Sequence, residues 1–270
     1  MNFVIIKCGG SVFERLPSSF YQNIAEIHKQ GKWRPVIVHG GGPLISKLLD
    51  QTGVPTTFVD GLRVTTNDVL DVVEMALSGA INKQIVRKLT EAGVKAVGLS
   101  GVDGKLLQAK PIAQTDKLGF VGEVEQVYTD IIKTVSKEGM IPVISPVGVD
   151  NNGQRYNINA DMAASAVAQA LHAKLCFVSD IPGIYEEING EKKIYHYLNE
   201  QKINRLIEQK VITDGMIPKV KSAIDALYKN VSEVSIVDGM EENGLLQFME
   251  GQSIGTRISL EKEVSHVTAN

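Results

Sequence analysis

The feature that most constrains this chain is a short apolar run that ends in glycines and occurs twice. In the first copy, residues 3–11, a β-branched run is followed by Lys7, Cys8, Gly9 and Gly10. Continuous apolar residues are typical of a strand buried on both faces of a sheet. Lys7 breaks that pattern, and a lysine at the end of a core strand either reaches solvent or holds an anion.

The second copy is the apolar run at 35–39, which is followed by Gly40, Gly41 and Gly42. Two such strands, each leading into a helix, predict βαβ units whose carboxyl ends lie side by side. Open α/β sheets bind ligands at those ends, and a glycine turn before a helix can present N–H groups to a phosphate. The alternative is ordinary turn chemistry, although three consecutive glycines cost conformational entropy and need a reason.

Composition excludes several classes of protein. The chain has 270 residues, a length that suits one large α/β domain or two lobes, and a net charge of −3, which gives no general attraction to nucleic acid or an anionic membrane. No signal sequence opens the chain, and no apolar run approaches the ~20 residues that cross a bilayer. Cys8 and Cys176 lie in apolar runs, which favours reduced thiols in a cytoplasmic protein.

The rest of the chain alternates predicted strands with predicted helices, which indicates a mainly parallel α/β sheet. Residues 105–110 and 119–128 predict a β-ribbon that projects from this sheet. The other predicted strands are 94–100, 141–149, 174–179, 232–237 and 254–259, the predicted helices include 17–31, 129–138, 162–171 and 199–210, and an exposed hairpin is predicted at 186–193.

Residues 67–92 predict a long helix whose first half is apolar over more than one face. Such a helix is either fully inside the protein or shared with another subunit. Gly79 and Asn82 predict a break or bend within it.

Three polar residues, Asn157, Asn159 and Asp161, precede an Ala-rich helix that is almost free of charge. Alternation places all three on one side of an extended segment, and polar side chains beside a buried helix must be hydrogen-bonded. One interpretation is that Asn159 or Asp161 caps the helix. A cap explains only one of the three residues, which favours a functional role for the cluster.

Two further basic residues stand in informative places. Arg63 follows a turn, and its planar guanidinium group suits a carboxylate, although a lone arginine is more often a surface residue or an ion-pair partner. Lys219 follows Pro218 in the first turn of a predicted helix. A cation is unfavourable at that end of a helix unless an anion is shared there, and the alternative is an exposed, solvated lysine.

Several common catalytic motifs are absent from the sequence. It has no GxGxxG dinucleotide motif after a strand, no GxxxxGK[ST] phosphate loop and no GxSxG elbow. The five histidines show no metal-ligand spacing. Nicotinamide chemistry, zinc hydrolysis and serine hydrolysis therefore lose support, and no side-chain metal site is predicted.

Five motifs together resemble the amino acid kinase family, and the resemblance covers residues 3–258. They are Lys7-Cys8-Gly9-Gly10, His39-Gly40-Gly41-Gly42-Pro43, Gly61-Leu62-Arg63, Asn157-Ile158-Asn159-Ala160-Asp161 and Asp214-Gly215-Met216-Ile217-Pro218-Lys219. The resemblance implies an open three-layer αβα sandwich around a mainly parallel central sheet. It also implies a single domain in which an N-lobe, about 1–173, binds the amino acid and forms the dimer, and a C-lobe, about 174–270, binds ATP.

Within the family, the match implies ATP-dependent phosphorylation of the γ-carboxylate of N-acetyl-L-glutamate in arginine biosynthesis. The matched catalytic residues are Lys7, Lys219 and Asp161, with Asp161 hydrogen-bonded to both lysines. The matched substrate-binding residues are Gly41, Gly42, Arg63, Asn157 and Asn159. The matched nucleotide-binding residues are Gly9, Gly10, Ser179, Asp180, Ile181, Pro182, Gly183, Ile184, Tyr185, Val211, Ile212 and Thr213.

The physics of phosphoryl transfer agrees with this set. The reaction needs fixed positive groups around the transferred oxygens, and an ionised carboxylate is its own nucleophile, so no general base is required. Mg²⁺ is expected to be held mainly by the ATP phosphates, since the sequence offers no carboxylate cluster.

The resemblance also implies a homodimer formed through the apolar helix near 67–78. Arginine-inhibited members carry an extra N-terminal helix, so this chain is expected to be an arginine-insensitive homodimer. Cys8 stands where leucine or tyrosine is usual, and Val102 stands where lysine is common. Neither matches a site residue, so only local packing or lid behaviour is in question.

Two other interpretations remain open from the sequence. The first is a sibling kinase that acts on acetylaminoadipate, carbamate, aspartate or UMP, because one methylene of substrate changes binding by only about 1–3 kcal/mol. The second is a catalytically silent sensor of acetylglutamate or nucleotide. A pure binder would not need Lys7, Asp161 and Lys219 together, which favours the enzyme.

Overall fold

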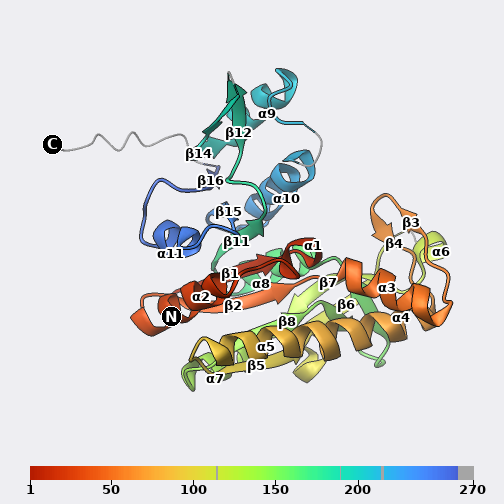
Figure 1. Cartoon of the computed structure of the whole chain (residues 1–270). Coiled ribbons are helices and arrows are strands. Elements are labelled where there is room, and N and C mark those ends of the chain that lie inside the picture. Colours follow the sequence, from red (N-terminus) through yellow and green to blue (C-terminus); the bar gives the residue numbers. More distant parts are fainter. Residues whose placement is uncertain (114, 189, 214–215, 261–270) are drawn as a thin grey trace.

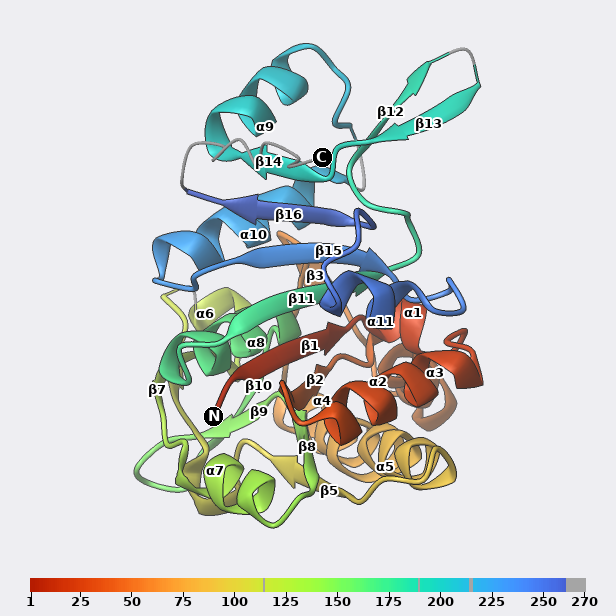
Figure 2. The same cartoon turned by 90° about the vertical axis from the view of Figure 1, so that its left-hand side faces the viewer.

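The structure is a computed structural model that describes residues 1–113, 115–188, 190–213 and 216–260. Its centre is an eight-stranded sheet in the order β14-β16-β15-β11-β1-β2-β8-β5 (Figures 1 and 2). Every neighbouring pair is parallel except β15 and β16. The strands are β1 (Phe3–Cys8), β2 (Arg34–His39), β5 (Ala96–Ser100), β8 (Ile141–Ser145), β11 (Lys174–Ser179), β14 (Tyr197–Asn199), β15 (Val234–Asp238) and β16 (Thr256–Ser259).

Helices cover both faces of this sheet, and β1 shows why. Val4 and Ile6 pack into one hydrophobic cluster, whereas Phe3 and Ile5 pack into a second. Successive side chains of a strand point to opposite faces, so a strand that is apolar throughout must be covered twice. The predicted three-layer αβα sandwich is therefore confirmed.

The first cluster includes helices α2 (Ser18–Gln30), α3 (Gly42–Thr52), α4 (Asn67–Glu74), α5 (Asn82–Glu91) and α11 (Gly244–Met249). The second includes α7 (Asp130–Lys137), α8 (Ala160–Ala170), α9 (Glu200–Glu208) and α10 (Met216–Tyr228). The described chain also has two single turns, α1 (Gly10–Phe13) and α6 (Thr115–Leu118), a 3₁₀ turn at Asp103–Lys105 and a π-helical segment at Met75–Ile81. Within the described ranges, no helix is both long and apolar enough to span a bilayer.

Two sequence predictions about strands were wrong. The expected projecting ribbon, β6 (Leu107–Pro111) and β7 (Val121–Val127), closes instead with β9 (Val147–Val149) and β10 (Arg155–Ile158) into a four-stranded barrel. The expected single strand at 141–149 is two strands, β8 and β9, separated by Pro146. Proline has no N–H with which to continue a ladder, and β9 pairs with the barrel rather than the central sheet.

Two small hairpins lie outside the central sheet and the barrel. They are β3 (Phe58–Val59) with β4 (Leu62–Arg63), and β12 (Tyr185–Ile188) with β13 (Glu191–Ile194), and the second confirms the hairpin predicted at 186–193. Asn189 of its turn, and Asp214 and Gly215 of the last sequence motif, lie outside the described residues.

The predicted irregularity at 67–92 is a π-helical segment, Met75–Ile81, between α4 and α5. Asn82 follows it and is fully buried. Its Nδ2 donates to the carbonyl oxygens of Val143 (2.9 Å) and Leu99 (3.2 Å) and lies 3.3 Å from His39 Nε2. A methyl group added at Gly98 would lie 1.8 Å from Asn82 Oδ1. This amide therefore ties the helix to β2, β5 and β8, and Gly98 leaves room for it.

His39 is the neutral partner in this network. It is fully buried, and burial lowers its pKa from 6.5 to about 4. Its Nδ1 donates to the Gly40 carbonyl at 3.2 Å, because a carbonyl oxygen can only accept, so Nε2 of the neutral ring carries no hydrogen and faces Asn82 Nδ2.

We expect this histidine to make stability depend on pH. The unfolded chain binds a proton near pH 6.5 and the folded chain only near pH 4, so stability is full above pH 6.5 and falls as the pH drops toward 4. The loss attributable to His39 is about 3 kcal/mol, at ~1.4 kcal/mol for each pKa unit. Urea unfolding at pH 7, 5 and 4 should therefore show a shallower decline for His39→Gln than for the wild type. Parallel declines would contradict this account.

Candidate active site

The two glycine turns of the sequence meet at the carboxyl ends of β1 and β2. These strands pair in parallel with Cys8 opposite His39, and Gly40 N donates to the Cys8 carbonyl at 2.9 Å. A methyl group added at Gly10 would lie 2.7 Å from the amide nitrogen of Gly42 and 2.8 Å from that of Gly41. Only glycine fits there without moving the backbone, and the predicted meeting of the turns is confirmed.

Lys7 lies beside these turns and is paired with Asp161. Its Nζ lies 2.7 Å from Asp161 Oδ1, and the lysine side chain is 15% exposed. The contact is an ion pair rather than an aligned hydrogen bond, since Oδ1 has no partner with hydrogen-bond geometry. Lys7 therefore takes a charged partner at the end of a core strand, as its position predicts, and one side of its ammonium group stays open.

Asn159 is the N-cap of α8, one of the two interpretations that the sequence left open. Its Oδ1 accepts from the backbone N–H groups of Asp161 (2.8 Å) and Met162 (3.2 Å). The cap places Asp161 in the first turn of α8 and so aims its carboxylate at Lys7.

Lys219 approaches from the other end of the chain, on α10. Its Nζ donates to Ser179 Oγ at 2.7 Å and lies 3.8 Å from Asp180 Oδ1. Burial lowers its pKa; the charge of Lys7 also lowers it, whereas Asp180 and Asp161 raise it. No described hydrogen bond or ion pair joins Lys219 to Asp161, so the expected bonding of Asp161 to both lysines is not what this structure has. The ammonium group of Lys219 instead contacts Ser179 and Asp180, at the end of β11.

Arg63 is buried and has only neutral oxygens for hydrogen-bond partners in the described chain. It is 7% exposed, and its guanidinium donates to Thr56 Oγ1 (2.6 Å), Ser46 Oγ (2.8 Å) and the Gly42 carbonyl (3.2 Å). The ring of Phe58 lies under it at 4.6 Å. Burial without a carboxylate lowers its pKa and leaves its charge uncompensated, which suits an anionic ligand. The sequence could not have indicated Ser46 and Thr56, because serine and threonine occur on most surfaces.

A hollow of about 220 Å³ brings together eight of the predicted residues, including all five that were predicted to bind substrate. Those that line it are Lys7, Gly10, Gly41, Gly42, Arg63, Asn157, Asn159 and Asp161. A larger hollow of about 310 Å³ includes Lys32, Trp33 and Lys174 and contains neither glycine turn. The smaller hollow is therefore the candidate site, because both glycine turns, Arg63 and the Lys7–Asp161 pair meet there.

The predicted nucleotide segments lie beyond β11, outside this hollow. Ile184 and Ile212 are buried in the core, so any contact they make with a ligand would come from their backbone. Asp180 accepts from Arg15 Nη2 at 2.6 Å, and this bond is the main cause of its lowered pKa. Arg15, which sequence reasoning missed, thereby links the first glycine turn to the nucleotide segment.

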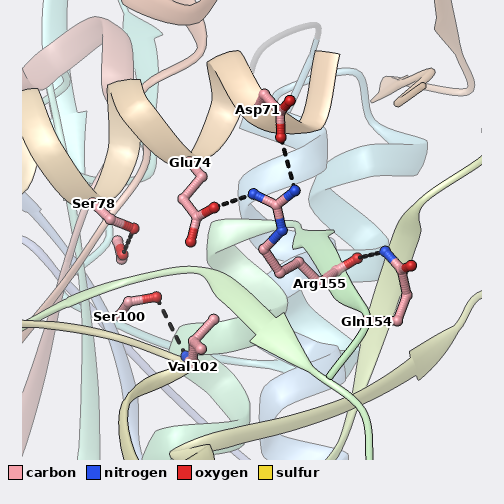
Figure 3. A network of polar contacts seen from close by, with 8 residues as sticks. Asp71, Glu74, Ser78, Ser100, Val102, Gln154 and Arg155 are labelled. Carbon is pink, nitrogen blue, oxygen red and sulfur yellow. Dashed lines mark hydrogen bonds and ion pairs between the residues drawn. The ribbon is translucent and has the colours of Figure 1, made fainter. Parts of the chain in front are cut away.

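The strand that carries Asn157 is clamped to α4 by Arg155 (Figure 3). The Arg155 guanidinium bonds Asp71 at 2.7 Å and also Glu74, two acidic residues one turn apart on α4. Gln154 donates to the Arg155 carbonyl at 2.8 Å. The clamp fixes β10 two residues before Asn157.

Cys8 lies next to Lys7 in the sequence but is not a reactive thiol. Burial raises the pKa of the Cys8 thiol to about 12, so this neighbour of Lys7 is not a thiolate nucleophile. Among the residues described, no group of three or more His, Cys, Asp or Glu side chains is arranged to hold a metal ion.

This geometry can be set beside known proteins. The model of the amino acid kinase family matches residues 2–238. The chain belongs to the amino acid kinase family. A relative named acetylglutamate kinase, from Oceanobacillus iheyensis, is 46% identical over 99% of this chain and 100% of its own length. Another of that name, from Geobacillus stearothermophilus, is 51% identical over 87% of this chain and 90% of its own.

A solved structure supports the family fold. The structure of smu.665 from Streptococcus mutans UA159 aligns with a TM-score of 0.79 at 33% identity, over 96% of this chain and 99% of that one. As an amino acid kinase, the chain is a phosphotransferase, which agrees with Lys7 and the glycine amides at the ends of parallel strands, and with Lys219, whose ammonium group contacts Ser179 at the end of β11.

We expect Gly10→Ala to reduce turnover by about 10²-fold or more, because the methyl group would push apart two turns that supply hydrogen-bond donors. Circular dichroism and steady-state kinetics of the same preparation would separate this effect from unfolding. Gly79→Ala is the matched control, because a methyl group added there would have no side chain beyond its chain neighbours and no other chain segment within 4 Å. An active Gly10→Ala protein would mean that the contact between the turns does not matter for transfer.

Proposed function

We propose that this chain transfers the γ-phosphoryl group of ATP to the γ-carboxylate of N-acetyl-L-glutamate, forming N-acetylglutamyl 5-phosphate in arginine biosynthesis. The observation that carries the proposal is the buried Arg63, without an acidic partner in the described chain, beside the Lys7–Asp161 pair in one hollow. Relatives named acetylglutamate kinase at 46% and 51% identity give the substrate.

Arg63 would take one carboxylate of the substrate. Three neutral oxygens hold its guanidinium in place without cancelling its charge. A guanidinium fixed in this way can form a two-point contact with a carboxylate at little entropic cost. The amides of Gly41 and Gly42, with Asn157 and Asn159, would bind the rest of the substrate.

The transferred group would sit between Lys7 and Lys219, above the amide of Gly10. An oxygen of the γ-carboxylate attacks the γ-phosphorus as the bond to the ADP oxygen breaks. The two ammonium groups stabilise charge on the transferred oxygens, and Asp161 holds Lys7 in position. The acceptor is already ionised and needs no general base, which agrees with a histidine, His39, that stays neutral and buried.

The nucleotide would bind mainly the C-lobe, about 174–270, through residues 179–185 and 211–213, and would also contact Gly9 and Gly10 of the N-lobe. The N-lobe, about 1–173, would bind the acceptor. Mg²⁺ would be held mainly through the ATP phosphates, since the described side chains form no metal cluster of their own. Bound there, the ion would neutralise phosphate charge.

The assembly and the compartment are also proposed. Met75, in the π-helical segment after α4, is a large apolar side chain that is 61% exposed, which supports a homodimer through the helix near 67–78. The free, buried thiols Cys8 and Cys176 fit a reducing cytoplasm, where we place the reaction.

The experiment that tests this function is a comparison of acceptors. ADP release should be measured in parallel with acetylglutamate, acetylaminoadipate, carbamate, aspartate and UMP. We expect the highest kcat/KM with acetylglutamate. If none of these acceptors is phosphorylated but one of them binds tightly, the protein is a sensor rather than an enzyme.

We expect Lys219→Ala to lower kcat by at least about 10²-fold, on the scale of losing one donor to a developing charge. Lys221→Ala, an exposed lysine on the same helix, is the matched control and should retain wild-type turnover. Turnover near the wild-type value in Lys219→Ala would refute the role given to this residue.

A further inference from the structure

Arg63 and Asn157, two of the residues proposed to bind substrate, are joined through one buried hydroxyl group. Thr65 is fully buried, and its Oγ1 donates to the Arg63 carbonyl at 2.8 Å. Asn157 Nδ2 lies 3.1 Å from the same oxygen. A threonine hydroxyl group has a single hydrogen. Thr65 donates it to the Arg63 carbonyl, so the hydroxyl oxygen can only accept from Asn157.

The single hydrogen of the Thr65 hydroxyl group determines which way the Asn157 amide group points. The nitrogen must face Thr65, because the oxygen would meet an oxygen that has no hydrogen left to donate. The amide oxygen, Oδ1, therefore lies on the other side of the group. Since Asn157 lines the 220 Å³ hollow, that side is the ligand side.

The backbone holds Thr65 too firmly for it to adapt. Its N–H donates to the Leu118 carbonyl at 2.9 Å, and its carbonyl accepts from Phe120 N at 2.8 Å. Gly119, between these partners, has φ +65°, and a methyl group added there would lie 2.4 Å from the Thr65 carbonyl oxygen. The hydroxyl group is thus a fixed reference for Asn157.

Apart from Asn157, the polar groups that line the hollow are mostly hydrogen-bond donors and charged side chains. Arg63 and Lys7 are cationic, and the glycine turns present N–H groups. The side-chain oxygen of Asn159 is used by the cap of α8, and Asp161 is paired with Lys7. Among the described side chains that line the hollow, Asn157 Oδ1 is the neutral acceptor best placed for a ligand N–H group.

We propose that Thr65 is a positioning residue that fixes the Asn157 amide so that Oδ1 accepts from the N–H group of an N-acylated amino acid. This inference rests on the proposed function and deepens it. The Thr65 hydroxyl group then sets a preference for a substrate with an amide N–H over an analogue of the same shape that lacks it.

The test compares N-acetyl-L-glutamate with 2-acetoxyglutarate, in which an ester oxygen replaces the amide nitrogen. The wild type should prefer the amide by about 10- to 100-fold in kcat/KM, because the ester sets an oxygen against Asn157 Oδ1. This measurement needs no variant. Equal use of amide and ester by the wild type would overturn the inference.

Two variants separate the hydroxyl group from packing. Thr65→Val keeps the shape of the side chain and removes the hydroxyl group, so the Asn157 amide group is free to flip and exchange its oxygen and nitrogen positions. The preference should fall to within about threefold, with KM for acetylglutamate raised about tenfold and KM for ATP unchanged. Thr65→Ser keeps the hydroxyl and loses a methyl group, and should retain the wild-type preference.

A Thr65→Ser protein that loses the preference as fully as Thr65→Val would overturn the proposal, as would a Thr65→Val protein with the wild-type preference. A purely structural role would lower the activity toward both substrates equally. A wild type inert toward acetylglutamate would overturn the proposed function and this inference with it, whereas an active wild type without preference overturns this inference alone.

Discussion

The structure depends on a close backbone contact between two glycine turns, which is possible because Gly10 has no side chain. β1 and β2 run in parallel at the sheet centre, so their two glycine turns must leave the same edge side by side. A methyl group on Gly10 would lie 2.7 Å and 2.8 Å from two amide nitrogens of the second turn. Because the turns touch, their amides can converge on one ligand and α8 can bring Asp161 to Lys7. The site follows from this approach of two chain segments.

Three basic residues around that contact are held in place by different kinds of partner. Lys7 has a carboxylate partner, whereas Arg63 is held by neutral oxygens and keeps its full charge. Lys219 is held by Ser179 and Asp180 on the nucleotide side. Burying a cation without a carboxylate is costly, and an anionic ligand removes that cost on binding. The proposed acceptor side is therefore prepared for an anion, while the proposed nucleotide side holds Lys219 through groups that a phosphate can replace.

Local pattern was enough to predict a mainly parallel α/β sheet, whereas the αβα sandwich was implied by the resemblance to the amino acid kinase family. Apolar runs and glycines mark the ends of β1 and β2, and Asn159 is a cap because its side chain acts on its own helix, within three residues. The closed barrel was not predictable, because β6, β9 and β10 are chosen as partners by tertiary packing rather than by sequence spacing. The partner of Lys219 lies 40 residues away, and Thr65 meets Asn157 across 92 residues. Such contacts leave no periodic signal.

The central claim is that Lys7 and Lys219 flank the phosphoryl group in transit. A crystal structure with MgADP, N-acetyl-L-glutamate and aluminium fluoride tests it most directly, because the fluoride complex stands in for the transferred group. The account predicts the aluminium centre in line between the substrate carboxylate and ADP, with both lysine Nζ atoms and the Gly10 amide about 3 Å from its fluorine ligands. A fluoride complex bound away from either lysine, with Lys219 still on Ser179, would contradict it.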